Sequence, residues 1–201
     1  MKITRALQGT ALVIAAAFAI LAWSNEVYIE QVGDDTTVTI TQDGSSNTVG
    51  SELSPAYIGS GSNTVTIDQV GTSNSLTLTV NGSGTTVTAS ATGDNNSQTI
   101  TCGSTASATC TSSTISSVIV GDSNTTIQDL GTGASHTSSI SITGDSNSVT
   151  HTSTNTGTTS ASITVTGSTN TIGVTQSGTT AKAVSVTSTG TGNTVSITQS
   201  N

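Results

Sequence analysis

Most of the chain alternates apolar and polar residues in short runs separated by glycine. The stretch NEVYIEQVGDDTTVTITQDGSSN shows the pattern clearly, because Asn25, Thr36 and Asn47 lie 11 residues apart, as do Gln31 and Gln42. Each half begins with Asn or Thr and continues, at every second position, with two apolar residues, a Gln and a Gly. An apolar period of two predicts a β-strand with one buried face, followed by a turn at the glycine.

A Gly-x-x-Asn motif ends each pair of such halves. Its asparagine falls at positions 47, 74, 96, 124, 147, 170 and 193, at spacings of 27, 22, 28, 23, 23 and 23. A nearly fixed period of this length indicates an array of stacked structural units. The two long spacings predict loop insertions near 53–62 and 103–113 in a single repeat domain that spans 25–201.

Two strands and two turns per unit make a flattened coil with one strand on each side. Coils stacked at ~4.8 Å form two parallel sheets across a thin core. The sequence therefore predicts an all-β, two-sheet parallel β-solenoid of about seven and a half coils of 22–23 residues. Its length would be roughly 35 Å, from eight layers at ~4.8 Å.

The predicted core consists of the inward apolar positions on both sheets. On the first sheet they are Val27, Ile29, Leu76, Leu78, Ile100, Val149, Ile172, Val174, Val195 and Ile197. On the second they are Val38, Ile40, Val65, Ile67, Val87, Ala89, Ile115, Ile119, Ile140, Ile142, Ile163, Val165, Val184 and Val186.

The inward positions beside this core carry amides that recur at one phase. Stacked identical amides can hydrogen-bond from layer to layer, which favours polar ladders over solvated side chains. The ladder candidates are Asn25, Gln31, Gln42, Asn47, Asn63, Gln69, Asn74, Asn96, Asn124, Asn147, Asn170, Gln176, Asn193 and Gln199. The predicted turn glycines are Gly33, Gly44, Gly71, Gly93, Gly121, Gly144, Gly167 and Gly190.

The N-terminus has the pattern of a secretory signal peptide over 1–24. A basic start with Lys2 and Arg5 precedes an apolar run that ends in small residues, and a retained membrane anchor is the alternative. After cleavage, Lys182 would be the only basic side chain against 11 acidic residues. Nucleic acid is excluded as a partner on this charge, and the mature chain is expected to be secreted without a membrane anchor.

The segment 25–47 resembles the curlin repeat of bacterial curli amyloid subunits, in which polar, apolar and Gln positions alternate along each strand with Gly and Asn in the turn. The resemblance is strongest over 25–47, 63–80 and 170–201 and looser between 97 and 165. It implies a secreted, cell-surface subunit of an extracellular functional amyloid fibre for biofilm matrix, cell adhesion or surface coating. The implied partners are further copies of the chain, a nucleator and an outer-membrane export machinery, with no cofactor.

The end coils of such a solenoid present unpaired backbone groups beside an apolar row. Edges of this kind template another chain, so head-to-tail stacking into a cross-β fibre is the expected mechanism. The final strand NTVSITQS leaves one sheet a layer longer than the other. It is either a hook into the next subunit or a surface covered by a separate cap.

Two polar features invite further hypotheses. Cys102 and Cys110 are the only cysteines, and in an exported chain a disulfide between them would close the second insertion. Asp94, Asp122 and Asp145 follow the turn glycine in consecutive coils, where they are either a solvated column that slows aggregation or a site where calcium relieves repulsion.

Two other function classes compete with the fibre. The outward positions are rich in Thr-x-Thr pairs, which would form a flat lattice similar to the face of ice-binding solenoids, although Glu26, Glu30, Glu52 and Asp68 interrupt it. Catalysis is not expected, because the only histidines are His136, predicted in a turn, and His151, predicted at an inward strand position, and neither pairs with a nucleophile by spacing.

Overall fold

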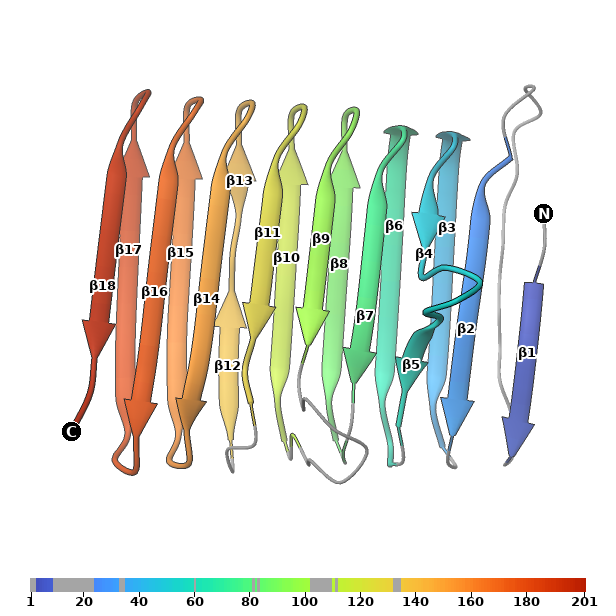
Figure 1. Cartoon of the computed structure of the whole chain (residues 1–201), viewed down its shortest axis with the longest axis horizontal. Helices are drawn as coiled ribbons and strands as arrows, with labels where there is room; N and C mark the ends of the chain where they lie inside the picture. Colours follow the sequence, from blue (N-terminus) through green and yellow to red (C-terminus); the bar gives the residue numbers. More distant parts are fainter. Residues whose placement is uncertain are drawn as a thin grey trace.

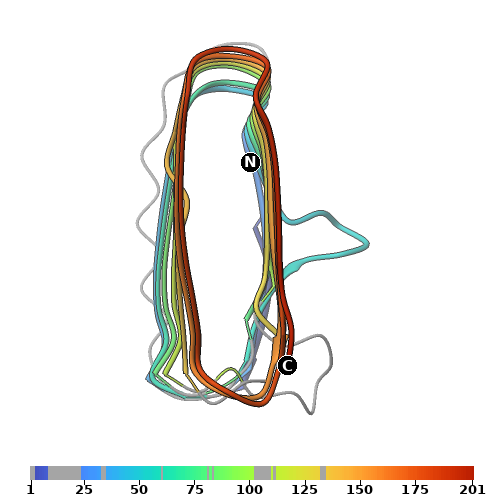
Figure 2. The ribbon, with the colours of Figure 1, turned by 90° about the vertical axis from the view of Figure 1, so that its left-hand side faces the viewer.

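The computed structural model describes residues 3–8, 24–32, 35–59, 61–80, 82, 84–101, 110, 112–131 and 135–201. Throughout this part of the chain the regular structure is β-strand, and the strands form two parallel sheets that face each other (Figure 1). Viewed along the long axis, the coils superimpose as one flattened ring (Figure 2). The predicted all-β, two-sheet parallel β-solenoid is confirmed.

The chain alternates between the two sheets, which we name sheet A and sheet B. Sheet A contains β1 (Ile3–Gln8), β2 (Glu26–Val32), β4 (Thr48–Val49), β5 (Ala56–Ile58), β7 (Ser75–Val80), β9 (Ser97–Thr101), β11 (Thr125–Asp129), β14 (Ser148–Asn155), β16 (Thr171–Gly178) and β18 (Thr194–Gln199). Sheet B contains β3 (Thr37–Ser45), β6 (Thr64–Thr72), β8 (Thr86–Thr92), β10 (Thr114–Val120), β12 (His136–Ser139), β13 (Ile142–Thr143), β15 (Thr159–Thr166) and β17 (Lys182–Thr189).

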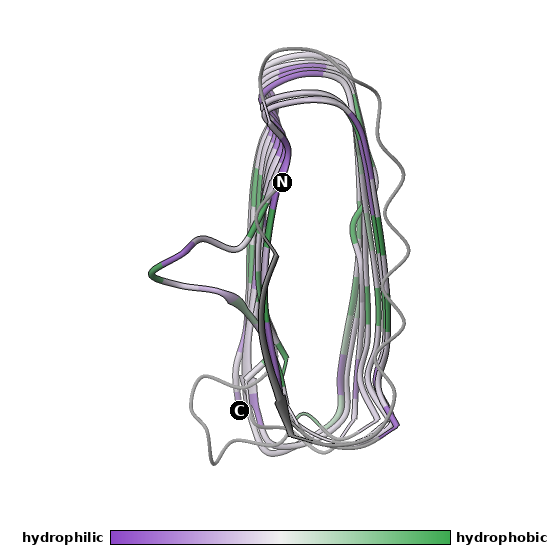
Figure 3. Ribbon diagram, turned by 90° about the vertical axis from the view of Figure 1, so that its right-hand side faces the viewer, coloured by the Kyte–Doolittle hydropathy of each residue, from purple (hydrophilic) through white to green (hydrophobic). Residues whose placement is uncertain are grey.

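Each strand pairs in register with the equivalent strand of the next coil. Val38 pairs with Val65, which pairs with Val87, and the same columns continue through Ile115. Because side chains alternate between faces, columns of apolar residues, such as those that begin at Val38 and Ile40, point inward along each sheet. Figure 3 shows these hydrophobic segments along both long sides of the ring.

The predicted core positions are buried, apart from Val184, Val195 and Ile197 near the C-terminal end, which are partly buried. The buried apolar set is larger than predicted, since it also includes Val49, Ala56, Ile58, Val80, Ala91, Leu130 and Ala161. These buried apolar residues line the interior of the coils from Val27 to Val186.

One coil of sheet A is interrupted by an excursion at 50–55. The chain leaves the sheet after β4, projects outward and returns at β5, and both short strands still pair with β2 and β7 (Figure 2). The excursion overlaps only the start of the expected insertion at 53–62 and lies within a strand layer instead of at a corner. Most of the second expected insertion, at 103–113, lies outside the described residues.

The strand β1 falls within the segment predicted to be the signal peptide. It pairs in parallel with β2, with Ile3 opposite Val27, and so lies at the N-terminal edge of sheet A. Most of 1–24 lies outside the described residues, and the signal peptide remains a prediction. Among the residues that the structure describes, no helix has the length and apolar character needed to span a membrane.

Candidate functional site: stacked amides and open sheet edges

An asparagine column runs along one corner of the coil, at the start of every sheet A layer. Its members are Asn25, Asn47, Asn74, Asn96, Asn124, Asn147, Asn170 and Asn193, and all but Asn193 are buried. Asn124 is representative: its backbone N–H and its Nδ2 both donate to Oδ1 of Asn96, at 3.0 and 3.1 Å. Its Nδ2 also donates to the carbonyl oxygen of Gly144 at 2.7 Å. From Asn74 to Asn170, each amide of the column joins three layers in this way.

The Gly-x-x-Asn turn places this column. Gly121 has φ of +128° and Ser123 has φ of +58°, and the same pair of left-handed conformations recurs at the other turns of this corner. A Cβ on Gly121 would collide with the carbonyl oxygen of Gly144 in the next coil. Glycine is required both by its backbone conformation and by the close stacking of the corners. Of the other predicted turn glycines, Gly33 lies outside the described residues.

The glutamines form two short columns. Gln42 Nε2 donates to Gln69 Oε1 at 2.8 Å in sheet B, and Gln176 Nε2 donates to Gln199 Oε1 at 2.9 Å in sheet A. Gln31 departs from the predicted ladder, because its partner across the strands is Ile58.

Asn63 also departs from the ladder. The register places it between Thr36 and Thr85 in sheet B, and its Nδ2 donates to the carbonyl oxygens of Gly59 and Gly61 in its own corner. Its layer neighbours thus provide hydroxyls instead of amides, and the asparagine column is confined to sheet A.

A polar network lies beside the apolar core in the middle coils. Gln128 Nε2 donates to Ser138 Oγ at 3.0 Å, and Ser138 Oγ lies 2.9 Å from Nδ1 of His151. His151 Nε2 in turn lies 2.9 Å from Oε1 of Gln176, so a hydrogen bond links the histidine to the glutamine pair of sheet A. Burial lowers the pKa of His151, and its hydrogen bond to Gln176 partly offsets this effect.

His136 is the first residue of β12 and is fully buried, so its predicted position in a turn is wrong. Neither ring nitrogen has a hydrogen-bond partner among the described residues. Burial lowers the pKa of His136, and the nearby His151 lowers it further. Both imidazoles are therefore neutral interior groups at pH 7.

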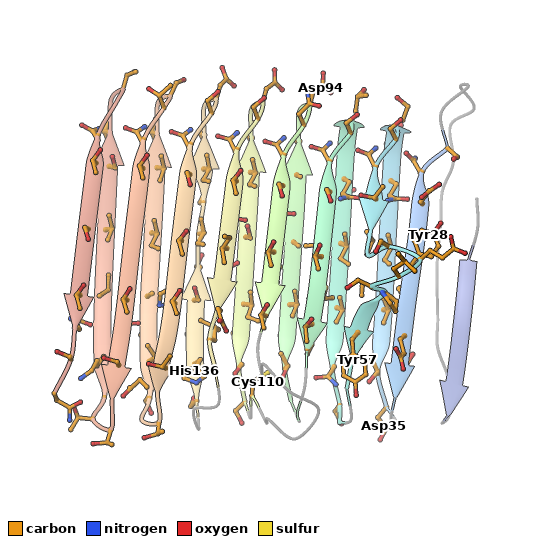
Figure 4. The ribbon with its side chains drawn as sticks, in the orientation of Figure 1. Tyr28, Asp35, Tyr57, Asp94, Cys110 and His136 are labelled. Carbon is orange, nitrogen blue, oxygen red and sulfur yellow. The ribbon has the colours of Figure 1, made fainter. Side chains whose placement is uncertain are left out.

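The aspartates at the corner bond to the backbone of the preceding coil. Thr72 N–H donates to Asp94 Oδ1 at 2.7 Å, Asp94 N–H to Asp122 Oδ1 at 2.7 Å, and Asp122 N–H to Asp145 Oδ1 at 2.9 Å. Asp94 is labelled at the corner in Figure 4. These bonds stabilise the carboxylates, and no cluster of His, Cys, Asp and Glu in the described chain is suited to hold a metal ion.

The two ends of the solenoid differ from the middle in their pairing. Within the described chain, β18 pairs only with β16, β17 only with β15, and β3 only with β6. The inward residues Val195 and Ile197 of β18 and Val184 of β17 are partly exposed at the C-terminal end. The C-terminal end thus combines a row of backbone donors and acceptors with apolar side chains. At the N-terminal end β2 pairs with β1, so within the described chain the strands with a single partner there are β1 and β3.

The outer face of sheet B carries a rank of threonines. Thr37, Thr64, Thr86, Thr114 and Thr137 pair in register across five strands, and all five are exposed. The rank of outward residues two positions farther along begins with Thr39, Thr66 and Thr88.

A stack of coils held together by amide columns defines a structural repeat protein of the parallel β-solenoid class. The family model described as the curlin associated repeat matches residues 24–50. The chain therefore carries a curlin repeat there, as the residues of 25–47 indicated. Neither the curated proteins nor the solved structures include a match.

Proposed function

We propose that this chain is a secreted structural subunit that self-assembles head to tail into an extracellular, curli-like cross-β fibre. The observation that carries the proposal is the match between the two ends of the 25–201 chain. Once cleavage removes β1 from β2, the β2–β3 end offers strands that match the β17–β18 end in direction, spacing and inward apolar pattern. Such edges bind another strand unless a bulge, charge or cap blocks them.

The interior supports the same function. Parallel in-register strands with amide columns reproduce within one chain the contacts that hold cross-β fibres together. Adding a copy extends the backbone ladder and the core by the same contacts. The curlin repeat at 24–50 adds a family in which chains of this kind form extracellular fibres.

Fibre formation by the 25–201 chain tests the proposal. The chain is refolded from denaturant, thioflavin fluorescence is followed, and the product is imaged and examined by fibre diffraction. The expected result is fibres with a ~4.7 Å reflection along their axis. A protein that stays monomeric for days would refute self-assembly as its function.

The export and surface roles belong to the same proposal. The fibre lies at the cell surface, after cleavage of 1–24 and passage through an outer-membrane export machinery, and a nucleator starts its growth. It serves as biofilm matrix, adhesin or coating. Mapping the N-terminus of protein recovered from outside cells checks the cleavage, because processing leaves residue 25 or a close neighbour first.

A Cys102–Cys110 disulfide would fix the second insertion to the corner. Cys110 is buried, and its carbonyl oxygen accepts a hydrogen bond from Thr85 Oγ1 at 3.1 Å, while Cys102 lies outside the described residues. We infer that the bond forms during export, in an oxidising compartment. Mass spectrometry before and after reduction tests it, since the bond lowers the mass of the chain by two hydrogens.

Ice binding through sheet B is a second candidate, favoured by the exposed rank that begins with Thr37 and Thr64. Its hydroxyls and methyls repeat at ~4.8 Å between strands. Thermal hysteresis of the soluble chain tests this function. A Thr86→Lys variant should abolish any hysteresis, with Thr194→Lys on the outer face of sheet A as the matched control.

A further inference from the structure

From β2 onward, the described solenoid has an odd number of strand layers when the layers of both sheets are counted together. Sheet A contributes eight layers, because β4 and β5 share one, and sheet B contributes seven, because β12 and β13 share one. Within residues 25–201, the first and last described strands, β2 and β18, therefore both lie on sheet A. At the C-terminal end, β18 lies beyond the last strand of sheet B, β17 (Figure 1).

We propose that each copy in the fibre is turned by half a revolution about the fibre axis relative to the copy before it. In this arrangement β2 of the next copy pairs with β17, and β3 of the next copy pairs with β18. The inference rests on the proposed function and specifies its interface. The partner is a second copy of this chain, which continues the coil as though its strands were the next half-coils.

Strand direction permits this arrangement. The strands of sheet A run one way in Figure 1 and those of sheet B run the opposite way. A half-turn about the long axis reverses each strand and carries sheet A to the position of sheet B. The β2 strand of the next copy then runs parallel to β17, as in every described pairing within the chain.

Docking without the half-turn leaves one strand layer of sheet B empty at the junction. If β2 of the next copy pairs with β18, then β3 of that copy lies two layers from β17, at ~9.6 Å instead of ~4.8 Å. The eight residues of β17, Lys182–Thr189, would keep an unpaired edge at every junction. Backbone groups left unpaired next to a core are costly, so the rotated arrangement is favoured because it pairs both end strands.

The side chains of the two ends match in the rotated register. Val27 and Ile29 of the next copy continue the inward row of Val184 and Val186 on β17. On the other sheet, Val38, Ile40 and Gln42 continue Val195, Ile197 and Gln199 on β18. The Gln199–Gln42 contact repeats the 2.8 Å Gln42–Gln69 and 2.9 Å Gln176–Gln199 bonds found within the chain.

The corner contact has a precedent within the chain as well. The half-turn places Thr36 of the next copy beside Asn193. Thr36 and Asn63 are already layer neighbours within sheet B, because Thr37 pairs with Thr64. A Thr–Asn contact between layers is thus part of the existing fold.

Two cysteine pairs that share one position distinguish the arrangements. Glu30→Cys faces Thr187→Cys on β17 in the rotated register and Thr198→Cys on β18 in the unrotated one. Glu30 is half-buried, and Thr187 and Thr198 are exposed. Paired residues on parallel strands lie ~4.8 Å apart at Cα, within the range that a disulfide spans. Both double variants are prepared as 25–201 chains, assembled, imaged and oxidised, with the parent chain as the control for Cys102 and Cys110.

We expect a ladder of covalent dimers, trimers and higher species for Glu30→Cys with Thr187→Cys, lost on reduction, and none beyond the parent's for Glu30→Cys with Thr198→Cys. Fibre images should show a repeat of roughly 36 Å per copy with alternating azimuth, from seven and a half layers at ~4.8 Å. Fibres that cross-link through Thr198→Cys, or through neither pair, would overturn the half-turn and leave self-assembly standing. Failure of every chain to form fibres would overturn both proposals.

Discussion

Asn124 donates two hydrogen bonds to one oxygen of Asn96, from its backbone N–H at 3.0 Å and from its side-chain Nδ2 at 3.1 Å. The second proton of the same amide is donated to Gly144 in the following coil. One buried side chain thus ties together three layers. In an isolated coil this side chain would face solvent. It is buried because the neighbouring coils stack on both sides of it.

Replacement of Asn124 by alanine should lower the free energy of unfolding by about 1–3 kcal/mol, the cost of leaving buried polar groups unpaired. Urea unfolding followed by circular dichroism measures the change. Asn193→Ala is the matched control, because Asn193 is partly exposed in the last layer and its Nδ2 bonds only to Thr189 in its own turn. Equal losses for the two variants would contradict the role of the column.

Gly121→Ala should destabilise the chain far more than Gly192→Ala. Both glycines have positive φ, at +128° and +75°, so both variants carry backbone strain of order 1–3 kcal/mol. Only at Gly121 would the added Cβ also strike the next coil, while nothing lies within 4 Å of a Cβ at Gly192. The urea midpoints of the two variants check this, and similar midpoints would show that the corners do not stack closely.

Stability should fall as the pH drops below about 6.5, the ordinary histidine pKa. Burial lowers the pKa of His136 and of His151 in the folded chain, so between that lowered pKa and 6.5 only the unfolded chain takes up the proton. The unfolded state then binds more protons, and each histidine removes up to about 1.4 kcal/mol per pH unit.

His136→Asn tests the origin of this slope, because Asn63 occupies an equivalent position in sheet B. Unfolding free energies between pH 7 and pH 5 should decline less steeply in the variant than in the parent. An unchanged slope would place the pH sensitivity elsewhere in the chain.

Ile197→Lys should suppress fibre growth while leaving the monomer folded. Ile197 points inward on the terminal strand β18 and is only partly buried, so its lysine form can reach solvent in the monomer but not under another layer. Seeded elongation followed by thioflavin fluorescence measures the loss. Thr198→Lys, on the outward face of the same strand, should elongate at nearly the parent rate, and equal inhibition by both would point to a general charge effect.

The full chain should elongate more slowly than the 25–201 form. The strand β1 pairs with β2 over six residues and so occupies the edge that the next copy would use. Mixing each form with preformed fibres compares the two rates. Equal rates would show that β1 is displaced freely or does not cover the edge in solution.

The sequence by itself determined the architecture, because a period of two and a unit of 22–23 residues leave few ways to bury the apolar rows. It also identified the inward residues, since Val38 or Ile163 can face the core only in one phase of its strand. The curlin resemblance of 25–47 could be recognised from the same residues.

Only the tertiary structure decided which residues become neighbours from coil to coil. Gln31 lies opposite Ile58 and not another glutamine, because the excursion at 50–55 interrupts the layer and β5 resumes the sheet after it. His136 proved to be the buried start of β12, and Asp122 accepts a hydrogen bond from Asp94. These contacts depend on the register between strands 22 to 28 residues apart, which is set by packing and backbone pairing across the whole stack.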